Sequence, residues 1–187
     1  IPGWCHEPQL LMRVDCCIPD AAIWEAHVQT KRHLIEKVQQ LTGVSLDPGV
    51  PIFGFARRMT AYKRPDLLFS DLGRLQAIAR NHPFQIVLAG KAHPNDDNGK
   101  RLIELLYAHA RSLAGTITVV YLPDYDLALA QTLTAGSDVW LNTPLPPMEA
   151  SGTSGMKAAV NGVPSLSVLD GWWVEGHVED VTGWSIG

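Results

Sequence analysis

A cluster of basic residues occupies positions 57–64, directly after the apolar run 52–56. Four of its eight residues carry a positive charge: Arg57, Arg58, Lys63 and Arg64. Arginine binds an anion through a planar fork of N–H donors, whereas the lysine ammonium acts as a point charge. Together they suit a phosphate. A solvated basic loop would have the same composition, but the position after a predicted strand favours a binding site.

A second candidate site lies in residues 149–157, where glycine and small hydroxyl residues precede a predicted helix. Such residues leave backbone N–H groups accessible at the helix N-terminus, which attracts anions. Glu149 stands ahead of this turn, where a carboxylate could accept hydrogen bonds from hydroxyl groups, as in a sugar. We expect Lys157, in the first turns of the helix, to face the same pocket. A lysine beside phosphate donors is what covalent binding of pyridoxal phosphate requires.

The same turn could instead hold the phosphates of a nucleotide. It does not match the pattern Gly-x-x-x-x-Gly-Lys-Ser/Thr, because no hydroxyl residue follows Lys157. No Gly-x-Gly-x-x-Gly follows the first predicted strand either, which disfavours a dinucleotide. Tyr125 follows a third predicted strand, where it could cover a planar ligand or serve a structural role.

The elements that must position these residues follow from short apolar runs. Five of them predict buried strands: residues 52–56, 85–89, 117–122, 138–142 and 165–169. Helical spacing predicts helices over about 65–81, 100–113, 126–133 and 155–161, and an earlier one with Asp20 as N-cap that ends at Gly43. Alternating strands and helices indicate an α/β fold with a doubly wound, mostly parallel, Rossmann-like sheet. In such folds ligands bind at the carboxyl ends of the strands.

Composition narrows the class of protein further. The chain has 187 residues, of which 46% are hydrophobic and 18% charged, so it has the material for a core and is not intrinsically disordered. A net charge of −4 provides no positive field for nucleic acid or an anionic membrane. No apolar run approaches the roughly 18 to 20 residues of a membrane span. The odd set Cys5, Cys16 and Cys17 is a poor disulfide framework and fits a reducing cytoplasm.

Two regions differ in character along the chain. Residues 1–18 lack helical or strand periodicity, and we expect an irregular linker or docking arm. Residues 19–187 are expected to form a Rossmann-like domain that binds cofactor and phosphate. The chain begins at Ile1 rather than at methionine, and we expect it to be a piece of a longer protein whose N-terminal lobe is missing.

Residues 149–157, with 158–162 after them, resemble the cofactor-lysine motif of the α-glucan phosphorylases, which act on glycogen, starch or maltodextrin. Other blocks are similar to the same family in the same order: residues 57–64, 90–92, 124–125 and 170–176. The similarity is greatest to the shorter bacterial and archaeal type. Animal-type enzymes have Gly-Asn where this chain has Ser154 and Gly155.

The resemblance implies the C-terminal lobe of a glycosyltransferase-B fold with pyridoxal 5′-phosphate as cofactor. Lys157 would bind the cofactor as a Schiff base. The other implied cofactor-binding residues are Lys63, Arg57, Thr153, Ser154 and Tyr125. Arg58 would bind the substrate phosphate, and with Lys63 and Lys157 it forms the implied catalytic set. The implied sugar-binding residues are Glu149, Ala150, Ser151 and Gly152.

The implied reaction is phosphorolysis of a terminal α-1,4-linked glucose by inorganic phosphate, which gives glucose 1-phosphate. Two alternatives stay open. One is a nucleotide-sugar-dependent glucan synthase of the same fold, although those enzymes lack the Ser-Gly-Met-Lys ending. The other is a non-catalytic fragment that binds cofactor or phosphate. We expect little activity from one lobe alone; the expected partners are the α-glucan, inorganic phosphate, the protein's own N-terminal lobe and a possible second copy.

Overall fold

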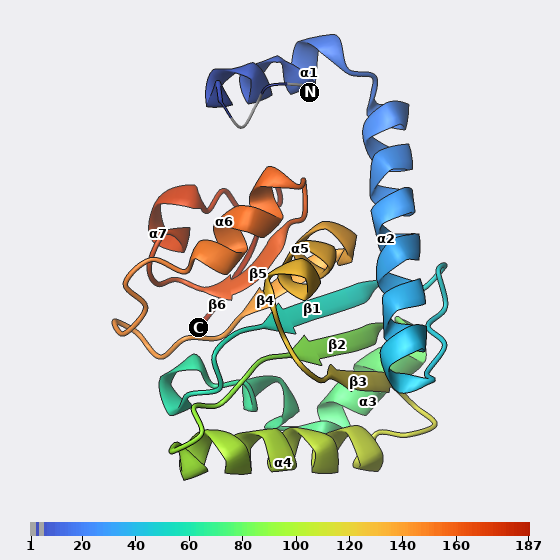
Figure 1. The fold of residues 1–187 in the computed structure, drawn as a ribbon, viewed down its shortest axis with the longest axis vertical. Coiled ribbons are helices and arrows are strands. Elements are labelled where there is room, and N and C mark those ends of the chain that lie inside the picture. The colour runs from blue at the N-terminus through green and yellow to red at the C-terminus, as the bar shows by residue number, and fades with distance from the viewer. Residues whose placement is uncertain (1–2, 4–5) are drawn as a thin grey trace.

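The computed structural model describes residue 3 and residues 6–187, and these contain a six-stranded sheet (Figure 1). The strand order is β3-β2-β1-β4-β5-β6, and every neighbouring pair is parallel. The strands are β1 (Ile52–Ala56), β2 (Gln85–Ala89), β3 (Thr118–Leu122), β4 (Val139–Asn142), β5 (Ser165–Val168) and β6 (Gly183–Ile186). The predicted doubly wound parallel α/β fold is therefore confirmed.

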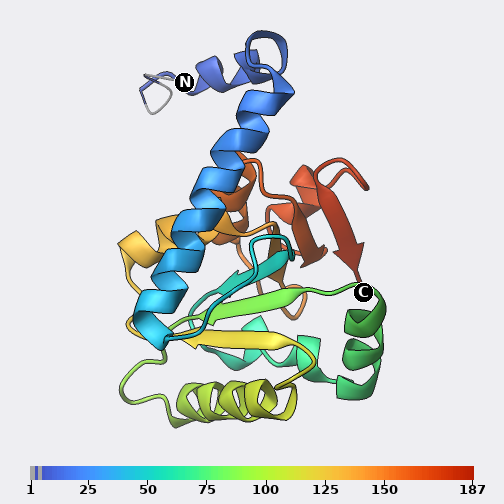
Figure 2. The ribbon, with the colours of Figure 1, turned by 90° about the vertical axis from the view of Figure 1, so that its right-hand side faces the viewer.

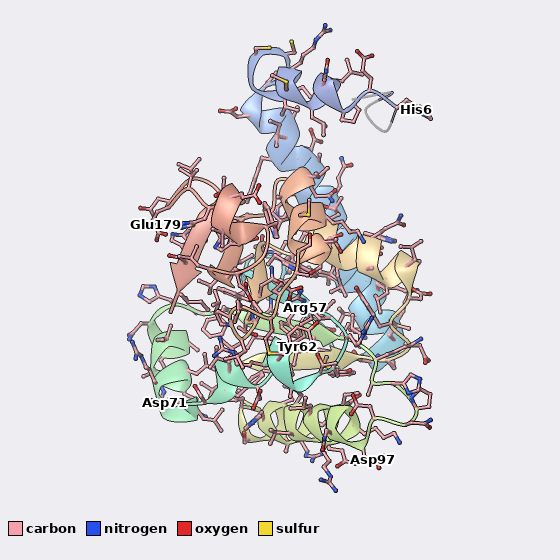
Figure 3. All side chains as sticks on the ribbon, turned by 90° about the vertical axis from the view of Figure 1, so that its left-hand side faces the viewer. His6, Arg57, Tyr62, Asp71, Asp97 and Glu179 are labelled. Atoms are coloured by element: carbon pink, nitrogen blue, oxygen red, sulfur yellow. The ribbon has the colours of Figure 1, made fainter. Side chains whose placement is uncertain are left out.

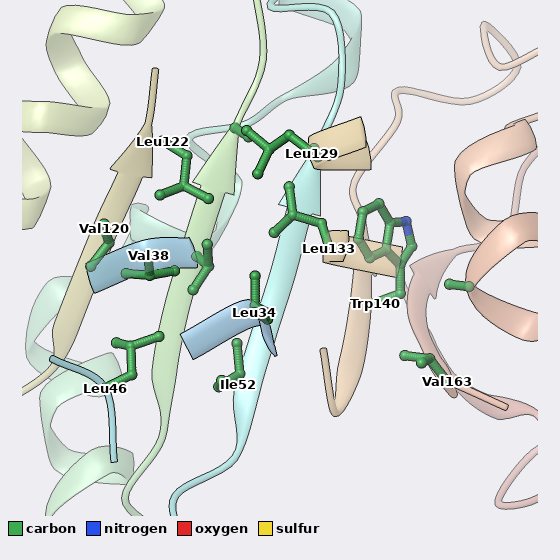
Figure 4. Packing of buried hydrophobic residues seen from close by; sticks show 14 residues of the cluster. Leu34, Val38, Leu46, Ile52, Val120, Leu122, Leu129, Leu133, Trp140 and Val163 are labelled. Carbon is green, nitrogen blue, oxygen red and sulfur yellow. The ribbon is translucent and has the colours of Figure 1, made fainter. Parts of the chain in front are cut away.

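Side chains of the central strands alternate between two cores, which explains why these strands are apolar throughout. Ile52 and Ala56 belong to one buried cluster, shown in Figure 4, whereas Phe55 belongs to the other. The first cluster is covered by α2 (Asp20–Thr42), α5 (Leu127–Gly136) and α6 (Thr153–Val160). The second is covered by α3 (Leu72–Asn81) and α4 (Asp97–Ser112).

The strand order reverses between β1 and β4, and this point determines where a ligand fits. From β1 the chain continues to β2 on one side, and from β4 it continues to β5 on the other. Ligands of doubly wound folds bind at such a switch point, outside the carboxyl ends of the strands. The segments after β1 and β4 are the two that carry the basic cluster and the glycine-containing turn.

Two local predictions need correction. Asp20 is the first residue of α2 rather than its cap, because Pro19 holds the N-cap position; the predicted end at Gly43, which is left-handed, is confirmed. The predicted helix 65–81 is interrupted after the short turn η3 (Leu67–Phe69). The Asp71 side chain accepts a hydrogen bond from Arg74 N and caps a new helix there.

Two C-terminal elements were not predicted. They are α7 (Trp173–Gly176) and the edge strand β6. β6 begins at Gly183, which has a φ of +146°. A Cβ atom there would lie 1.9 Å from Ser165 O, so the approach of β6 to β5 requires glycine at this position.

The N-terminal residues lie at the far end of α2, away from the sheet (Figures 1 and 2). They form the short helical turns η1 (Pro8–Arg13) and α1 (Val14–Cys17) where an irregular segment was expected. No residue of η1 is buried, and the role of this segment as a docking arm stays a prediction. Cys16 and Cys17 are exposed, and Cys5 lies outside the described residues. No helix in the described part of the chain is long and apolar enough to cross a membrane.

Candidate functional site

Two basic side chains converge on one carboxylate at the carboxyl end of β1. Arg57 Nη2 lies 2.7 Å and Lys63 Nζ lies 2.5 Å from the same atom, Glu149 Oε2. The exposed fractions of the Arg57, Lys63 and Glu149 side chains are 5%, 10% and 8%. Arg57 and Tyr62 are labelled near the centre of Figure 3. The structure thus joins the two segments singled out in the sequence into one buried ion cluster.

The sheet and two backbone contacts fix the basic segment. Arg57 follows β1 directly, and its backbone N–H donates to Ala89 O of the neighbouring strand β2. Lys63 ends the short turn η2 (Ala61–Lys63), and its carbonyl accepts a hydrogen bond from Thr143 Oγ1. The Arg64 guanidinium donates to Thr143 O and Pro144 O. Arg64 therefore connects the segments after β1 and β4 instead of contributing to an anion site.

The loop after β5 holds the turn that contains Glu149. Glu149 N donates to Asp170 Oδ2 at 2.9 Å, and Trp172 N donates to Ser151 O at 2.8 Å. Asp170 was not predicted to have a role. Its place in a block similar to the phosphorylases was the one available signal.

The glycines of the turn have a packing role besides exposing N–H groups. Gly152 is the left-handed N-cap of α6, with a φ of +86°. A Cβ atom on Gly155 would lie 2.8 Å from both Asn142 Nδ2 and Trp172 Nε1. Trp172 is partly buried against this turn and Trp173 is buried, so both tryptophans pack within the fold.

Several polar atoms at the site lack a hydrogen-bond partner within the described residues. They include Arg57 Nη1 and Ser154 Oγ, both buried. Asn142 Oδ1 and Trp173 Nε1 are also unpaired, and these residues line a cavity of about 10 Å³ with Arg57 and Glu149. A buried donor without an acceptor is unfavourable. Arg57 is thus able to bind more acceptor atoms than Glu149 supplies.

Other candidate residues lie around this cluster rather than in it. Arg58 and Lys157 are exposed and are not among the residues that line this cavity. That Lys157 faces the pocket of the turn stays a prediction. Thr153, Ala150 and Ser151 are exposed too. Tyr125 is partly buried. Burial raises its pKa, and the positive charge of Arg57 partly opposes that rise.

The fold and the cluster define a doubly wound α/β domain with buried cations at the switch point of its sheet. Residues 2–182 match the sequence profile of a family described as carbohydrate phosphorylase. The chain is 43% identical to a glycogen phosphorylase from Aquifex aeolicus, over 97% of the chain and 29% of that protein. It is also 43% identical to a maltodextrin phosphorylase from Thermococcus litoralis, over 91% of the chain and 22% of that protein. The chain therefore belongs to the carbohydrate phosphorylase family.

A plant relative is more distant than these bacterial and archaeal proteins. The H isozyme of α-glucan phosphorylase from Solanum tuberosum is 31% identical, over 82% of the chain and 20% of that protein. This order of similarity agrees with the predicted resemblance to the bacterial and archaeal type. The chain spans less than a third of the length of each of these relatives.

Proposed function

We propose that this domain carries the cofactor and phosphate sites of a cytoplasmic α-glucan phosphorylase. The reaction is attack of inorganic phosphate on the anomeric carbon of a terminal α-1,4-linked glucose. The glycosidic bond between this carbon and the glucan oxygen breaks, and a phosphate oxygen forms the new bond to the carbon. The proton of the inorganic phosphate ends on the departing glucan oxygen. The observation that supports the proposal best is that Arg57 and Lys63 are both buried beside Glu149 and that Arg57 Nη1 has no hydrogen-bond partner among the described residues. The membership of the chain in the carbohydrate phosphorylase family adds to this support.

The residues present fit pyridoxal 5′-phosphate. The exposed Lys157 amine is accessible for covalent attachment. Arg57 and Lys63 supply positive charge for the cofactor phosphate, and the unpaired hydroxyl of Ser154 supplies a donor. Thr153 contributes a backbone N–H at the start of α6. When bound, the cofactor supplies a phosphate whose second pKa of about 6 allows proton exchange near neutral pH.

The substrates would lie beside the cofactor. Arg58 is exposed next to the cluster, where it is free to bind inorganic phosphate. Two phosphates repel each other unless cations neutralise them, and the basic segment supplies this charge. Glu149 would bind the glucosyl unit together with the N–H groups of Ala150, Ser151 and Gly152. Tyr125 would pack against the cofactor ring.

The rest of the protein would complete the active site. The chain covers 29% or less of the relatives compared above, and enzymes with two lobes bind substrate in the cleft between them. We expect the 187 residues alone to show little or no phosphorolysis. An N-terminal lobe is therefore the first proposed partner, and a second copy of the protein is another.

Covalent attachment of the cofactor to Lys157 is the direct test. The protein is mixed with pyridoxal phosphate, its absorbance spectrum is recorded, borohydride is added, and the labelled peptide is identified. We expect a new absorbance band and a label on Lys157, both lost in Lys157→Ala. Lys100→Ala, which removes an exposed lysine on α4, is the control and should keep both signals. No uptake by the unmodified protein, or a label on another lysine, would refute the proposal.

A further inference from the structure

The Glu149 carboxylate occupies the position that a phosphate would need. Its Oε2 atom accepts hydrogen bonds from both Arg57 and Lys63, the two cations assigned to the cofactor phosphate. A phosphate cannot make the same contacts while this oxygen is in place. The cluster in its present form is therefore closed by an internal anion.

Electrostatics opposes the presence of both anions. The cluster holds two positive charges and one negative charge, all at least nine-tenths buried. A phosphate dianion added beside Glu149 would bring the total to three negative and two positive charges. Like charges repel strongly where water is excluded, so the carboxylate weakens phosphate binding as long as it stays.

The surroundings of Glu149 fix its backbone, whereas its side chain has glycines and a small cavity as neighbours. Its N–H group is fixed by Asp170 Oδ2. Glycines lie next to its Cγ atom: a Cβ atom on Gly171 would lie 3.1 Å from Cγ, and one on Gly152 would lie 3.5 Å from it. The small cavity described above adjoins the carboxylate. Release of the carboxylate from the cations therefore requires rotation of a side chain that is only 8% exposed.

We propose that Glu149 is a displaceable counter-ion that couples phosphate binding to sugar binding. Arg57 and Lys63 exchange the Glu149 carboxylate for a phosphate. The released carboxylate then accepts hydrogen bonds from the sugar hydroxyls. The inference rests on the proposed function, because it assumes that these cations bind phosphate. Thermodynamic linkage requires the effect to be reciprocal, so bound sugar also strengthens phosphate binding.

Calorimetric titration of the cofactor-free protein with inorganic phosphate tests the displacement. We expect Glu149→Gln to bind phosphate about tenfold more tightly than the unmodified protein, because no internal anion competes. Glu149→Asp keeps the charge on a shorter side chain, and it should give a smaller gain. Glu104→Gln, which removes an exposed charge on α4, should leave the affinity unchanged. Equal or weaker phosphate binding by a folded Glu149→Gln protein would refute the inference.

A second titration tests the coupling and separates the two proposals. Phosphate should increase the affinity of the unmodified protein for maltose, but not that of Glu149→Gln. If Lys157 takes up cofactor while Glu149→Gln leaves the phosphate affinity unchanged, the inference fails and the proposed function stands. If phosphate binds more tightly to Glu149→Gln but no cofactor is taken up, the displacement is supported and the proposed function fails.

Discussion

Opposite ends of the strand pair β1–β4 carry ion clusters of similar composition. At the carboxyl end, Glu149 lies between Arg57 and Lys63. At the amino end, Asp138 lies between His27 at 2.9 Å and Lys31 at 2.8 Å. Each cluster has one carboxylate and two basic side chains, and in each the carboxylate is mostly buried.

The two clusters differ in how completely their hydrogen bonds are satisfied. Asp138 Oδ2 also accepts a hydrogen bond from Ile52 N, and Lys31 Nζ also donates to Val50 O. At the other end, Arg57 Nη1 is buried without a partner among the described residues. A satisfied cluster stabilises the fold, whereas an unsatisfied one has capacity for a ligand. Composition alone does not distinguish them.

The largest effect is expected from breaking the satisfied cluster. Asp138→Ala removes the charge partner of Lys31 and the acceptor of Ile52 N, and it should lower the free energy of unfolding by about 3 kcal/mol. Urea denaturation measures this loss. Asp97→Ala removes the carboxylate of an exposed ion pair with Lys100 and should cost less than about 1 kcal/mol. Phosphate should not restore the stability of Asp138→Ala; restoration would mean that the amino end also binds anions.

A smaller loss is expected from crowding the turn at the carboxyl end. In Gly155→Ala, the new methyl group would overlap Trp172 and Asn142, which should cost about 1 to 3 kcal/mol. Gly73→Ala is the matched control in α3, because its Cβ atom would lie 3.6 Å from Asp71 Oδ1 in ordinary contact. Alanine is the better helix former, so this control should gain about 0.5 kcal/mol. Similar urea midpoints for the two variants would contradict the packing role of Gly155.

The smallest effect concerns the ionisation of Tyr125. Its pKa is raised above the ordinary value of 10.0 by burial and held back by the charge of Arg57. The neutral phenol therefore stabilises the fold up to about pH 10, and this contribution is lost as the pH rises through the folded-state pKa. Arg57→Ala should raise the pKa of Tyr125 further. Ultraviolet titration measures this pKa once the absorbance change of a Tyr125→Phe protein has been subtracted. The same change in Lys31→Gln, at the amino end, would show that the effect is not specific to Arg57.

Five of the six strands and the two segments that form the ion cluster could be predicted from the sequence. Short apolar runs gave the bounds of β1 and β2 correctly, because strands buried on both faces leave a continuous apolar pattern. The contact between Lys63 and Glu149 could not be predicted, since 86 residues separate them and both were assigned to ligands. Arg64 was grouped with the anion-binding residues because its charge is visible in the sequence, whereas its carbonyl partners are not. β6 was missed because only one of its four residues, Gly183, is buried, so the strand leaves no continuous apolar pattern.

α2 has no buried residue among its first eleven residues, 20–30. Its 23 residues extend over about 34 Å, and its buried residues Lys31, Leu34 and Val38 lie in the C-terminal part. His27 and Lys31 of α2 both contact Asp138. The start of the helix at Asp20 lies about 16 Å from Lys31 along the helix axis. A tilt of α2 by about 10° about Lys31 would therefore move the helix end at Asp20 by about 3 Å.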